Sequence, residues 1–411
     1  MSRLFVDITP LRTRRDFRLL FISQFVSLLG SNVTLVAVPF QVYRDTHSSL
    51  WVGAASVIQL PFLIAGSLWG GAAGDQHDRR RLMIAVALVQ TLLGTALGFN
   101  AWWTGSPLVV VLLLAALAAG AGGFAGPLRA AIIPRLVAPD ELVAAYGLNQ
   151  VMMNVSVVAG PSLAGLLLAG VGLSWCYLVD AGTFLALAGA TVLFRPIPPS
   201  GAAASTSLRQ SIAEGIAYVR SHRVAQSVYL IDLNAMVFGL PRALFPAIAL
   251  TEYHGGPRLL GLLYAAPGIG AVVMAFLTGW LARVTRQGRL VVLVVVAWGA
   301  AMALFGAVHV VAVAIVCLAV AGAMDVISTV LRNTILQNAI SDDFRSRVSS
   351  IQTAVVTGGP RLGDLESGLV ARLAGTRFSI VSGGLACVAG AALLVWRRRE
   401  FWWQRSLAET H

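Results

Sequence analysis

The sequence predicts an all-α integral membrane protein whose twelve transmembrane helices form two six-helix pseudo-repeat bundles. Among its 411 residues, 57% are hydrophobic and only 12% are charged, and the mean hydropathy is +0.78. Soluble proteins carry about a quarter charged residues, so this composition excludes a soluble globular domain. Twelve apolar segments of about twenty residues are each long enough to cross a bilayer as a helix.

The predicted spans follow one another through short polar connections. They are approximately Phe17–Tyr43, Trp51–Ala73, Leu82–Trp103, Pro107–Ile133, Leu142–Val171, Ser174–Phe194, Val224–Leu250, Leu259–Ala282, Leu290–Val308, Val310–Gln337, Val348–Ala374 and Phe378–Trp396. Glycine and proline within them are compatible with membrane helices, because neighbouring helices satisfy the backbone groups that they free. The three cysteines lie far apart in these apolar runs, so neither a disulfide framework nor a metal site is expected.

The arginines predict how the chain is oriented in the membrane. All thirty basic residues are arginine, and the span count places twenty-three of them in cytoplasmic segments and three in the opposite loops. Because short basic loops are retained inside, both termini of this multi-pass chain are predicted on the cytoplasmic side of the cell (inner or plasma) membrane. The net charge of +12 therefore reflects topology, and no nucleic-acid partner is expected.

The longest cytoplasmic connection, residues 195–223, separates the two halves. It begins with a linker composition rich in proline, serine and alanine. Leu208, Ile212 and Ile216 then recur on one face of an amphipathic stretch, which predicts a helix lying on the inner membrane surface. The predicted organisation is a cytoplasmic tail at 1–16, a six-helix bundle at 17–194, the linker at 195–223, a second six-helix bundle at 224–396 and a cytoplasmic tail at 397–411.

A charged connection that begins with glycine joins the second and third spans. The candidate gating residues in it are Gly71, Asp75, Asp78, Arg79 and Arg80. Glycines at positions 71 and 74 allow helix ends to approach closely, and the aspartates can accept hydrogen bonds from the arginines. We expect a charged clasp on the cytoplasmic side that holds one conformation; the alternative is a loop that only sets topology. Residues 279–289, after the eighth span, repeat this stretch in degenerate form, as expected of two related halves.

This connection resembles the loop signature of the major facilitator superfamily, in which an aspartate and then a basic pair follow a glycine. Asp78 stands where that family usually has a second glycine. The fifth span resembles the antiporter motif of exporters in the same superfamily, and its matching residues are Gly147, Gly160, Pro161 and Gly165. A smooth, proline-bent face of this kind packs tightly on a partner helix. The resemblance implies the major facilitator fold and export rather than import; ordinary small-residue packing is the alternative for the fifth span.

Ionisable residues inside membrane spans are costly, so each one is a candidate for function. The candidates for proton coupling are Asp364, Glu366, Asp325 and Asp232, and those for substrate binding are Arg242, Phe238, Arg332, Arg361 and Asn154. For all of them the alternative is a structural role, as an interhelical pair, a hydrogen bond or a packing contact.

Spacing separates the candidates that can pair within one helix from those that cannot. Asp325 and Arg332 are seven residues apart and share a helix face, which predicts a pair. Asp232 and Arg242 are ten residues apart, about 15 Å along a helix axis, and are not expected to pair.

The eleventh and sixth spans carry further acids. A proline and three glycines in residues 358–363 predict a bent or broken eleventh span that lines a cavity. Asp364 or Glu366 could bind and release a proton there. Asp180 lies near the outer end of the sixth span, where we expect solvation rather than a functional contact.

The chain is also similar to the enterobactin exporter group of this superfamily. The shared sequence words are short and include Arg242–Ala247, Leu260–Ala266 and Thr334–Gln337. The resemblance implies export of a siderophore such as enterobactin, or a similar amphipathic compound. We expect this export to be coupled to protons and to work by alternating access around a site near the midplane. A broad-specificity drug efflux antiporter for macrolide- or tetracycline-type substrates stays open as the alternative.

The expected partners follow from this interpretation. They are a small-molecule substrate and the lipid bilayer, with the proton motive force in place of any cofactor and no oligomer required. An enzyme is not expected, because the sequence has no cluster of histidine, cysteine and acidic residues near one membrane face.

Overall fold

The computed structural model describes residues 7–103, 105, 107–195, 217, 219–339 and 345–404, and the side chains of 282, 339 and 345–350 are not described. The predicted amphipathic stretch from Leu208 to Ile216 lies outside these residues. Within the described part of the chain, every regular element is a helix.

The main helices correspond to the twelve predicted spans. They are α2 (Arg15–Thr46), α3 (Ser49–Gln76), α4 (Arg79–Trp102), α5 (Leu108–Leu136), α6 (Leu142–Gly170), α7 (Leu173–Val192), α9 (Arg223–Phe238), α11 (Gly256–Leu277), α12 (Gln287–Ala307), α13 (Val311–Ala339), α14 (Arg345–Ala374) and α15 (Thr376–Arg397). The short elements include α1 (Thr9–Thr13), η1 (Pro139–Glu141), η4 (Thr278–Arg283) and α16 (Arg399–Trp402).

The predicted all-α membrane fold is confirmed. Eleven helical segments among the described residues are long and apolar enough to cross a membrane, judged by length and composition. The twelfth, α14, has 30 residues but is less apolar, because it carries Arg361, Asp364 and Glu366 as well as several hydroxyl side chains. The most polar helix therefore occupies the position of the predicted eleventh span.

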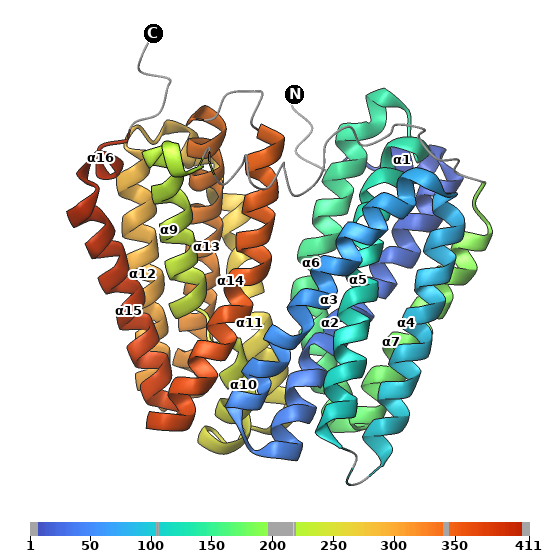
Figure 1. Cartoon of the computed structure of the whole chain (residues 1–411), viewed down its shortest axis with the longest axis horizontal. Coiled ribbons are helices and arrows are strands. Elements are labelled where there is room, and N and C mark those ends of the chain that lie inside the picture. The colour runs from blue at the N-terminus through green and yellow to red at the C-terminus, as the bar shows by residue number, and fades with distance from the viewer. Residues whose placement is uncertain are drawn as a thin grey trace. The chain divides into compact units, whose positions relative to one another are not determined.

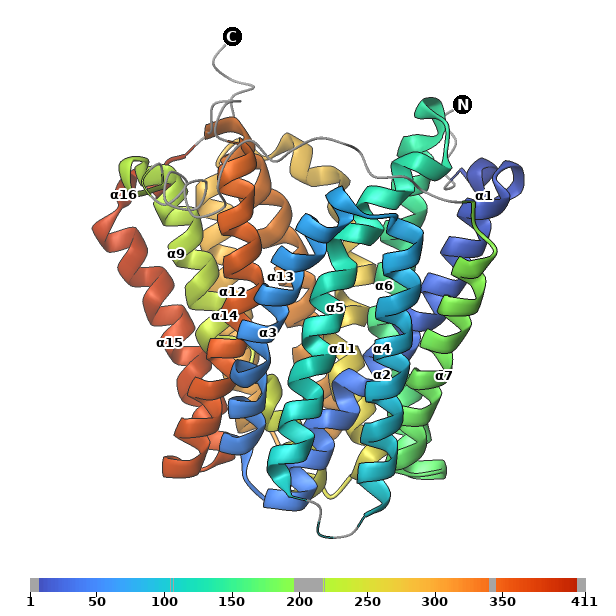
Figure 2. The same cartoon turned by 45° about the vertical axis from the view of Figure 1, so that its right-hand side comes forward.

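The chain forms two compact units. The first contains residues 1–47, 57–203 and 255–265, and the second contains residues 48–56, 204–254 and 266–411. In the first unit α7 packs against α2 and α4, while α2 packs on α6 and α4 on α5 (Figure 1). In the second unit α12 packs against α13 and α15, and α9 lies against α14 and α15 (Figure 2).

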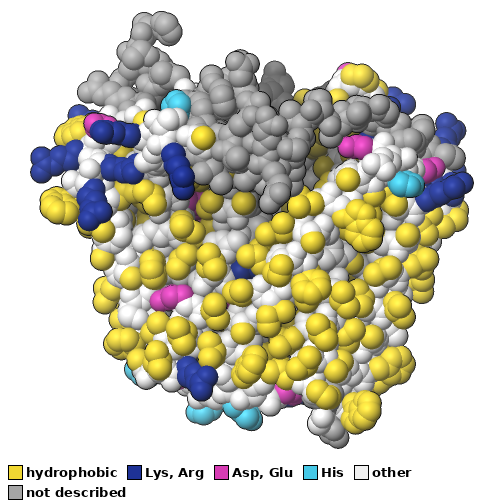
Figure 3. Space-filling model, in the orientation of Figure 1, with side chains coloured by type: hydrophobic (Ala, Val, Ile, Leu, Met, Phe, Trp, Pro, Cys, Tyr) yellow, Lys and Arg dark blue, Asp and Glu magenta, His cyan; other side chains and the backbone are white. Residues whose placement is uncertain are grey.

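The surface of each unit is apolar along its flanks. Large hydrophobic side chains are exposed there, including Trp69, Leu92 and Phe276. Figure 3 shows hydrophobic side chains covering the flanks, whereas the arginines gather mainly near one end of each unit. An apolar belt of this kind is suited to contact with lipid chains rather than with water.

Glycines bring α3 and α5 into backbone contact in the first unit. A Cβ at Gly66 or Gly70 would lie 2.0 Å or 2.2 Å from a backbone carbonyl oxygen of α5, and one at Gly74 would lie 2.7 Å from a methyl group of Leu128. Nothing lies within 4 Å of the Cβ position of Gly71. The predicted close approach is therefore right for Gly74 and wrong for Gly71, because glycines four residues apart share one helix face.

The interruption predicted for the eleventh span occurs in the seventh instead. After α9 the chain leaves the helix at Gly239–Pro241 and continues through η2 (Arg242–Leu244), α10 (Phe245–Ala247) and the π-helical η3 (Ile248–Glu252). By contrast, α14 runs without a break through its internal proline. Its glycines at 359 and 363 lie against α9, so they serve close helix packing rather than a bend.

Side chains of neighbouring helices satisfy the backbone groups that this interruption frees. The indole Nε1 of Trp298 on α12 donates to the carbonyl oxygen of Gly239, at 2.8 Å. The backbone N–H of Ala243 donates to Oδ1 of Asp364 on α14, at 3.0 Å. Because an unbonded backbone group in a membrane interior is costly, these two contacts stabilise the broken helix.

Replacing Gly70 by alanine should destabilise the protein, because the new Cβ would lie 2.2 Å from the carbonyl oxygen of Phe124. Overpacking of this kind costs about 1–3 kcal/mol. Gly71→Ala is the matched control, since its Cβ enters open space and alanine favours a helix over glycine. Thermal unfolding in detergent should show a lower midpoint for Gly70→Ala than for Gly71→Ala; equal midpoints would contradict the packing described.

Candidate functional site

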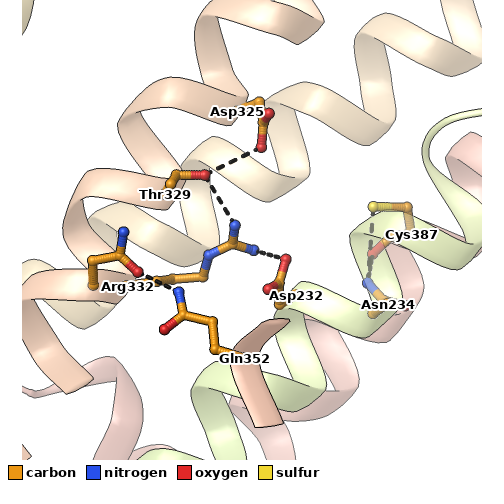
Figure 4. Close-up of polar contacts among 8 residues, drawn as sticks. Asp232, Asn234, Asp325, Thr329, Arg332, Gln352 and Cys387 are labelled. Carbon is orange, nitrogen blue, oxygen red and sulfur yellow. Dashed lines mark hydrogen bonds and ion pairs between the residues drawn. The ribbon is translucent and has the colours of Figure 1, made fainter. Parts of the chain in front are cut away.

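The candidate site lies in the second unit and is built on a buried ion pair between two helices. Asp232 on α9 and Arg332 on α13 form a salt bridge between Oδ1 and Nη1, and each residue is only 4% exposed. Figure 4 shows the guanidinium of Arg332 pointing at the Asp232 carboxyl across the gap between the two helices. Burial removes the hydration of both partners, so losing either one would leave an uncompensated buried charge.

A threonine extends the pair to a second acid on α13. The other terminal nitrogen of Arg332 donates to the hydroxyl of Thr329 at 3.2 Å, and this hydroxyl donates to Oδ1 of Asp325 at 3.4 Å (Figure 4). The predicted direct pair of Asp325 with Arg332 is therefore wrong. The spacing of three and four residues places Thr329 between them on one helix face.

The resulting cluster has two carboxyl groups and one guanidinium. If both Asp232 and Asp325 are ionised, the single positive charge of Arg332 leaves one negative charge without a direct counter-ion. The exposed Arg242, in the interruption after α9, is near enough to attract the carboxyls of Asp325 and Asp364. An arrangement of this kind can accept a proton or a hydrogen-bond donor from a ligand.

Asp364 lies where the broken helix meets α14. It is buried, accepts the N–H of Ala243 and has the side chain of Ser56 as a further hydrogen-bond partner. This carboxyl therefore holds the interruption in place, in addition to any role in proton binding. Glu366, two residues on, is half-buried and makes no hydrogen bond or ion pair within the described residues.

The remaining substrate-binding candidates make no hydrogen bond or ion pair with the cluster among the described residues. Arg361 donates to the carbonyl oxygen of Thr357 on its own helix, at 2.8 Å. Phe238 is half-buried at the end of α9, where its carbonyl approaches Gly383 of α15. Asn154 belongs to the first unit and accepts a hydrogen bond from Gln150 at 3.1 Å.

In the first unit, the predicted gating residues cap helix ends. Arg79 is buried and donates to the carbonyl oxygens of Gly74 at 3.1 Å and Ala131 at 3.4 Å, near the C-terminal ends of α3 and α5. It also forms a longer ion pair, 3.6 Å, with the exposed Asp75. Cations are favoured at these ends because the helix dipole is negative there.

The other two charged gating residues also bind backbone groups. Arg80 donates to the carbonyl oxygens of Thr191 at 3.2 Å and Val192 at 2.5 Å, at the end of α7. Asp78 is the N-cap of α4 and accepts the backbone N–H of Arg80 at 2.8 Å. The turn between α3 and α4 is thus tight although Asp78 stands in place of a glycine.

Some residues of the predicted antiporter motif pack against neighbouring helices, and one does not. Gly160 lies against Asn32 of α2, and Gly165 lies against Gly261 in the first turns of α11. The carbonyl of Pro161 also approaches Gly261. Beyond its own helix, no atom of the described residues lies within 4 Å of the Cβ position of Gly147, so three of the four motif residues contribute to helix contact.

Sequence reasoning missed Thr329, Ser56 and the structural role of Trp298. Thr329 could have been found, since it lies four residues after Asp325 and three before Arg332. No local pattern indicates the roles of Ser56 and Trp298, because their partners are distant in sequence and are brought near only by helix packing. Within the described residues no group of three or more histidine, cysteine and acidic side chains could hold a metal ion.

Comparison with known proteins agrees with this architecture. The family model described as transmembrane secretion effector matches residues 6–406. The enterobactin exporter EntS of Citrobacter koseri is 28% identical over 392 residues, covering 95% of this chain and 94% of that protein. The enterobactin exporter EntS of Salmonella choleraesuis is 30% identical over 404 residues, with the same coverage of both chains.

Solved transporter structures share the fold at low sequence identity. A POT family transporter in complex with 5-aminolevulinic acid has a TM-score of 0.73 at 11% identity, covering 94% of this chain and 97% of that one. The nucleoside transporter NupG has a TM-score of 0.72 at 13% identity, covering 94% and 98%. The family and the more similar relatives are transporters and not enzymes. The chain is therefore a membrane transporter that belongs to the transmembrane secretion effector family of the major facilitator superfamily.

Proposed function

We propose that this transporter exports an iron-free catecholate siderophore such as enterobactin, or a similar amphipathic compound, in exchange for protons by alternating access. Two enterobactin exporters align with 95% of the chain, which supports this substrate class. The observation that carries proton coupling is the cluster in which the buried Asp232 and the partly buried Asp325 share the guanidinium of Arg332. The proton motive force then supplies the driving energy without a cofactor.

A single proton balances the charge of this cluster. Within the three-residue cluster, two carboxylates and one guanidinium leave one net negative charge, which the nearby Arg242 attracts; protonation of one carboxyl removes that charge. Asp232 makes the direct ion pair, whereas Asp325 reaches the guanidinium only through Thr329. Asp325 is therefore the acid that binds and releases the proton in this proposal.

Competition for one carboxyl explains exchange of substrate against proton. The phenolic hydroxyl groups of an iron-free catecholate are hydrogen-bond donors, and an ionised carboxylate is a strong acceptor. The substrate binds when Asp325 is ionised and leaves when Asp325 gains a proton. The exposed guanidinium of Arg242 offers donors to the phenolic oxygens of the same substrate.

Broad-specificity drug efflux is the second candidate function. The same uncompensated negative charge would attract lipophilic amines, and many amphipathic drugs carry one. In that case Asp325 would bind the cation directly, and protonation would again release it.

Replacing Asp325 by asparagine should uncouple transport from the proton gradient. The variant keeps the size of the side chain and loses the protonatable group, so the rate of gradient-driven uptake into everted vesicles should fall by about tenfold, or ~1.4 kcal/mol of activation free energy. Asp45→Asn is the matched control, because Asp45 is an exposed acid paired with Arg44. Full gradient-driven uptake by Asp325→Asn would refute the assignment of the proton to this residue.

Breaking the buried ion pair on one side should destabilise the protein more than breaking it on both. Arg332→Gln leaves Asp232 as a buried charge without its direct counter-ion, which costs about 3–5 kcal/mol. The double variant Asp232→Asn with Arg332→Gln should recover most of the unfolding midpoint in detergent. Arg223→Gln tests an exposed pair, with Glu400, and should change little. An unrecovered double variant would show that the two residues do not act as a pair.

Iron loading should separate siderophore export from drug export. In an iron complex the phenolic oxygens are deprotonated and bound to metal, so they can no longer donate to Asp325. Proteoliposomes with an imposed pH gradient should therefore take up the iron-free catecholate and not its iron complex. Uptake of tetracycline or a macrolide, with no uptake of the free siderophore, would favour the second candidate function.

A further inference from the structure

Asp180 is a buried acid in the first unit that the proposed cluster does not use. It lies on α7 and is 5% exposed, so the solvated position expected from its place in the sequence is wrong. Its backbone contacts are those of an ordinary helical residue. A carboxyl group at this level of burial needs partners for both of its oxygens if it is ionised.

Only one oxygen of this carboxyl has a hydrogen-bond partner by geometry, because the nearby hydroxyl of Thr183 donates to the backbone carbonyl oxygen of Asp180, at 2.7 Å. The hydroxyl of Thr34 on α2 donates to Oδ2 of Asp180 at 2.5 Å. Oδ1 is fully buried and has no hydrogen-bond partner among the described residues. Oδ1 fits against α2 because residue 30 is glycine. A Cβ at this position would lie 2.6 Å from Oδ1 and 2.5 Å from Oγ1 of Thr183.

No positive charge faces Asp180 from the helices packed around it. The charged and titratable residues on α2, α4, α6 and α7 are Arg15, Asp16, Arg18, Tyr43, Arg44, Asp45, Arg79, Arg80, Arg81, Tyr146, Cys176 and Tyr177. Arg44 is ten residues from Thr34, and Arg81 is ten residues from Thr91, which contacts Ala181; each offset is about 15 Å along a helix.

The nearest titratable side chains on α7 are bonded elsewhere. The hydroxyl of Tyr177 donates to Oε1 of Gln41 at 2.7 Å, and the thiol of Cys176 donates to the carbonyl oxygen of Gly172 at 3.6 Å. Neither can compensate a negative charge on Asp180. A metal ion is not indicated as the partner either, since no group of three or more histidine, cysteine and acidic side chains among the described residues could hold one.

We propose that Asp180 is a proton-binding acid, neutral in this conformation and separate from the Asp232–Arg332–Asp325 cluster. The proton resides on one of the two carboxyl oxygens: on Oδ2 it would donate to the hydroxyl of Thr34, and on Oδ1 it would face Gly30. Movement of α2 away from α7 would admit water to Oδ1 and release the proton as a hydronium ion, leaving a carboxylate. That this proton takes part in transport rests on the proposed function; that the acid is protonated does not.

Infrared spectroscopy of the purified protein in lipid tests the protonation state directly. The wild-type protein at neutral pH should show a protonated-carboxyl stretching band that Asp180→Asn lacks and that the exposed-acid control Asp45→Asn retains. Thr34→Val should shift the frequency of this band, because it removes the donor to Oδ2. If the spectra of wild type and Asp180→Asn do not differ in this region, the proposal is overturned.

Proton counting tests the role in transport. In proteoliposomes, Asp180→Asn should move fewer protons per substrate than the wild-type protein, while Asp180→Glu should retain part of the coupling. An unchanged ratio in Asp180→Asn overturns a transport role. If Asp180→Asn does not fold, the band shift in Thr34→Val decides whether the acid is protonated. A wild-type protein that moves no protons would refute the coupling proposed above and leave the infrared result standing.

Discussion

The exclusion of water from the bilayer is the constraint on which the rest of this structure depends. A free backbone N–H or carbonyl group among apolar helices has no solvent to bond, so the protein must supply its partner. The interruption in the seventh span obeys this rule, because Trp298 and Asp364 reach in from two other helices to bind it. An irregular segment in mid-span therefore depends on hydrogen bonds from several helices. These bonds couple the movement of the segment to the movement of those helices.

The same constraint governs the charged side chains. Arg332 has two acids within reach, one directly and one through Thr329, whereas Asp180 has a hydroxyl and no cation. In water these differences would matter little, because solvent would screen each group. Where solvent is excluded, an acid without a counter-charge is more stable in its neutral, protonated form. The acids of the two units therefore have different surroundings: those in the second unit lie beside a guanidinium, and Asp180 in the first lies beside a hydroxyl.

Local sequence patterns predicted the helices but not their neighbours. Segment length and arginine placement are properties of the chain itself, so the spans could be predicted. The partner of Arg332 could not, because Asp232 lies 100 residues away and only packing brings their helices together. Helix phase likewise decides that Gly70, and not Gly71, meets α5. Proline and glycine content indicated that one span would be interrupted but assigned the interruption to 358–363, since composition cannot tell a bend from a site of close packing.

The helix caps made by Arg79 and Arg80 have a consequence for the choice of basic residue in this chain, which contains no lysine. Membrane insertion needs only positive charge in a loop, and a lysine would supply it. A guanidinium has five N–H donors in a rigid plane, so one side chain can reach two carbonyl oxygens at once. These arginines can thus direct orientation during synthesis and afterwards bind helix ends, Arg79 those of α3 and α5 and Arg80 that of α7. A lysine in the same loop would give the chain the same orientation in the membrane. Its single ammonium nitrogen is less suited to bind two carbonyl oxygens at once, so the helix ends would be held less firmly.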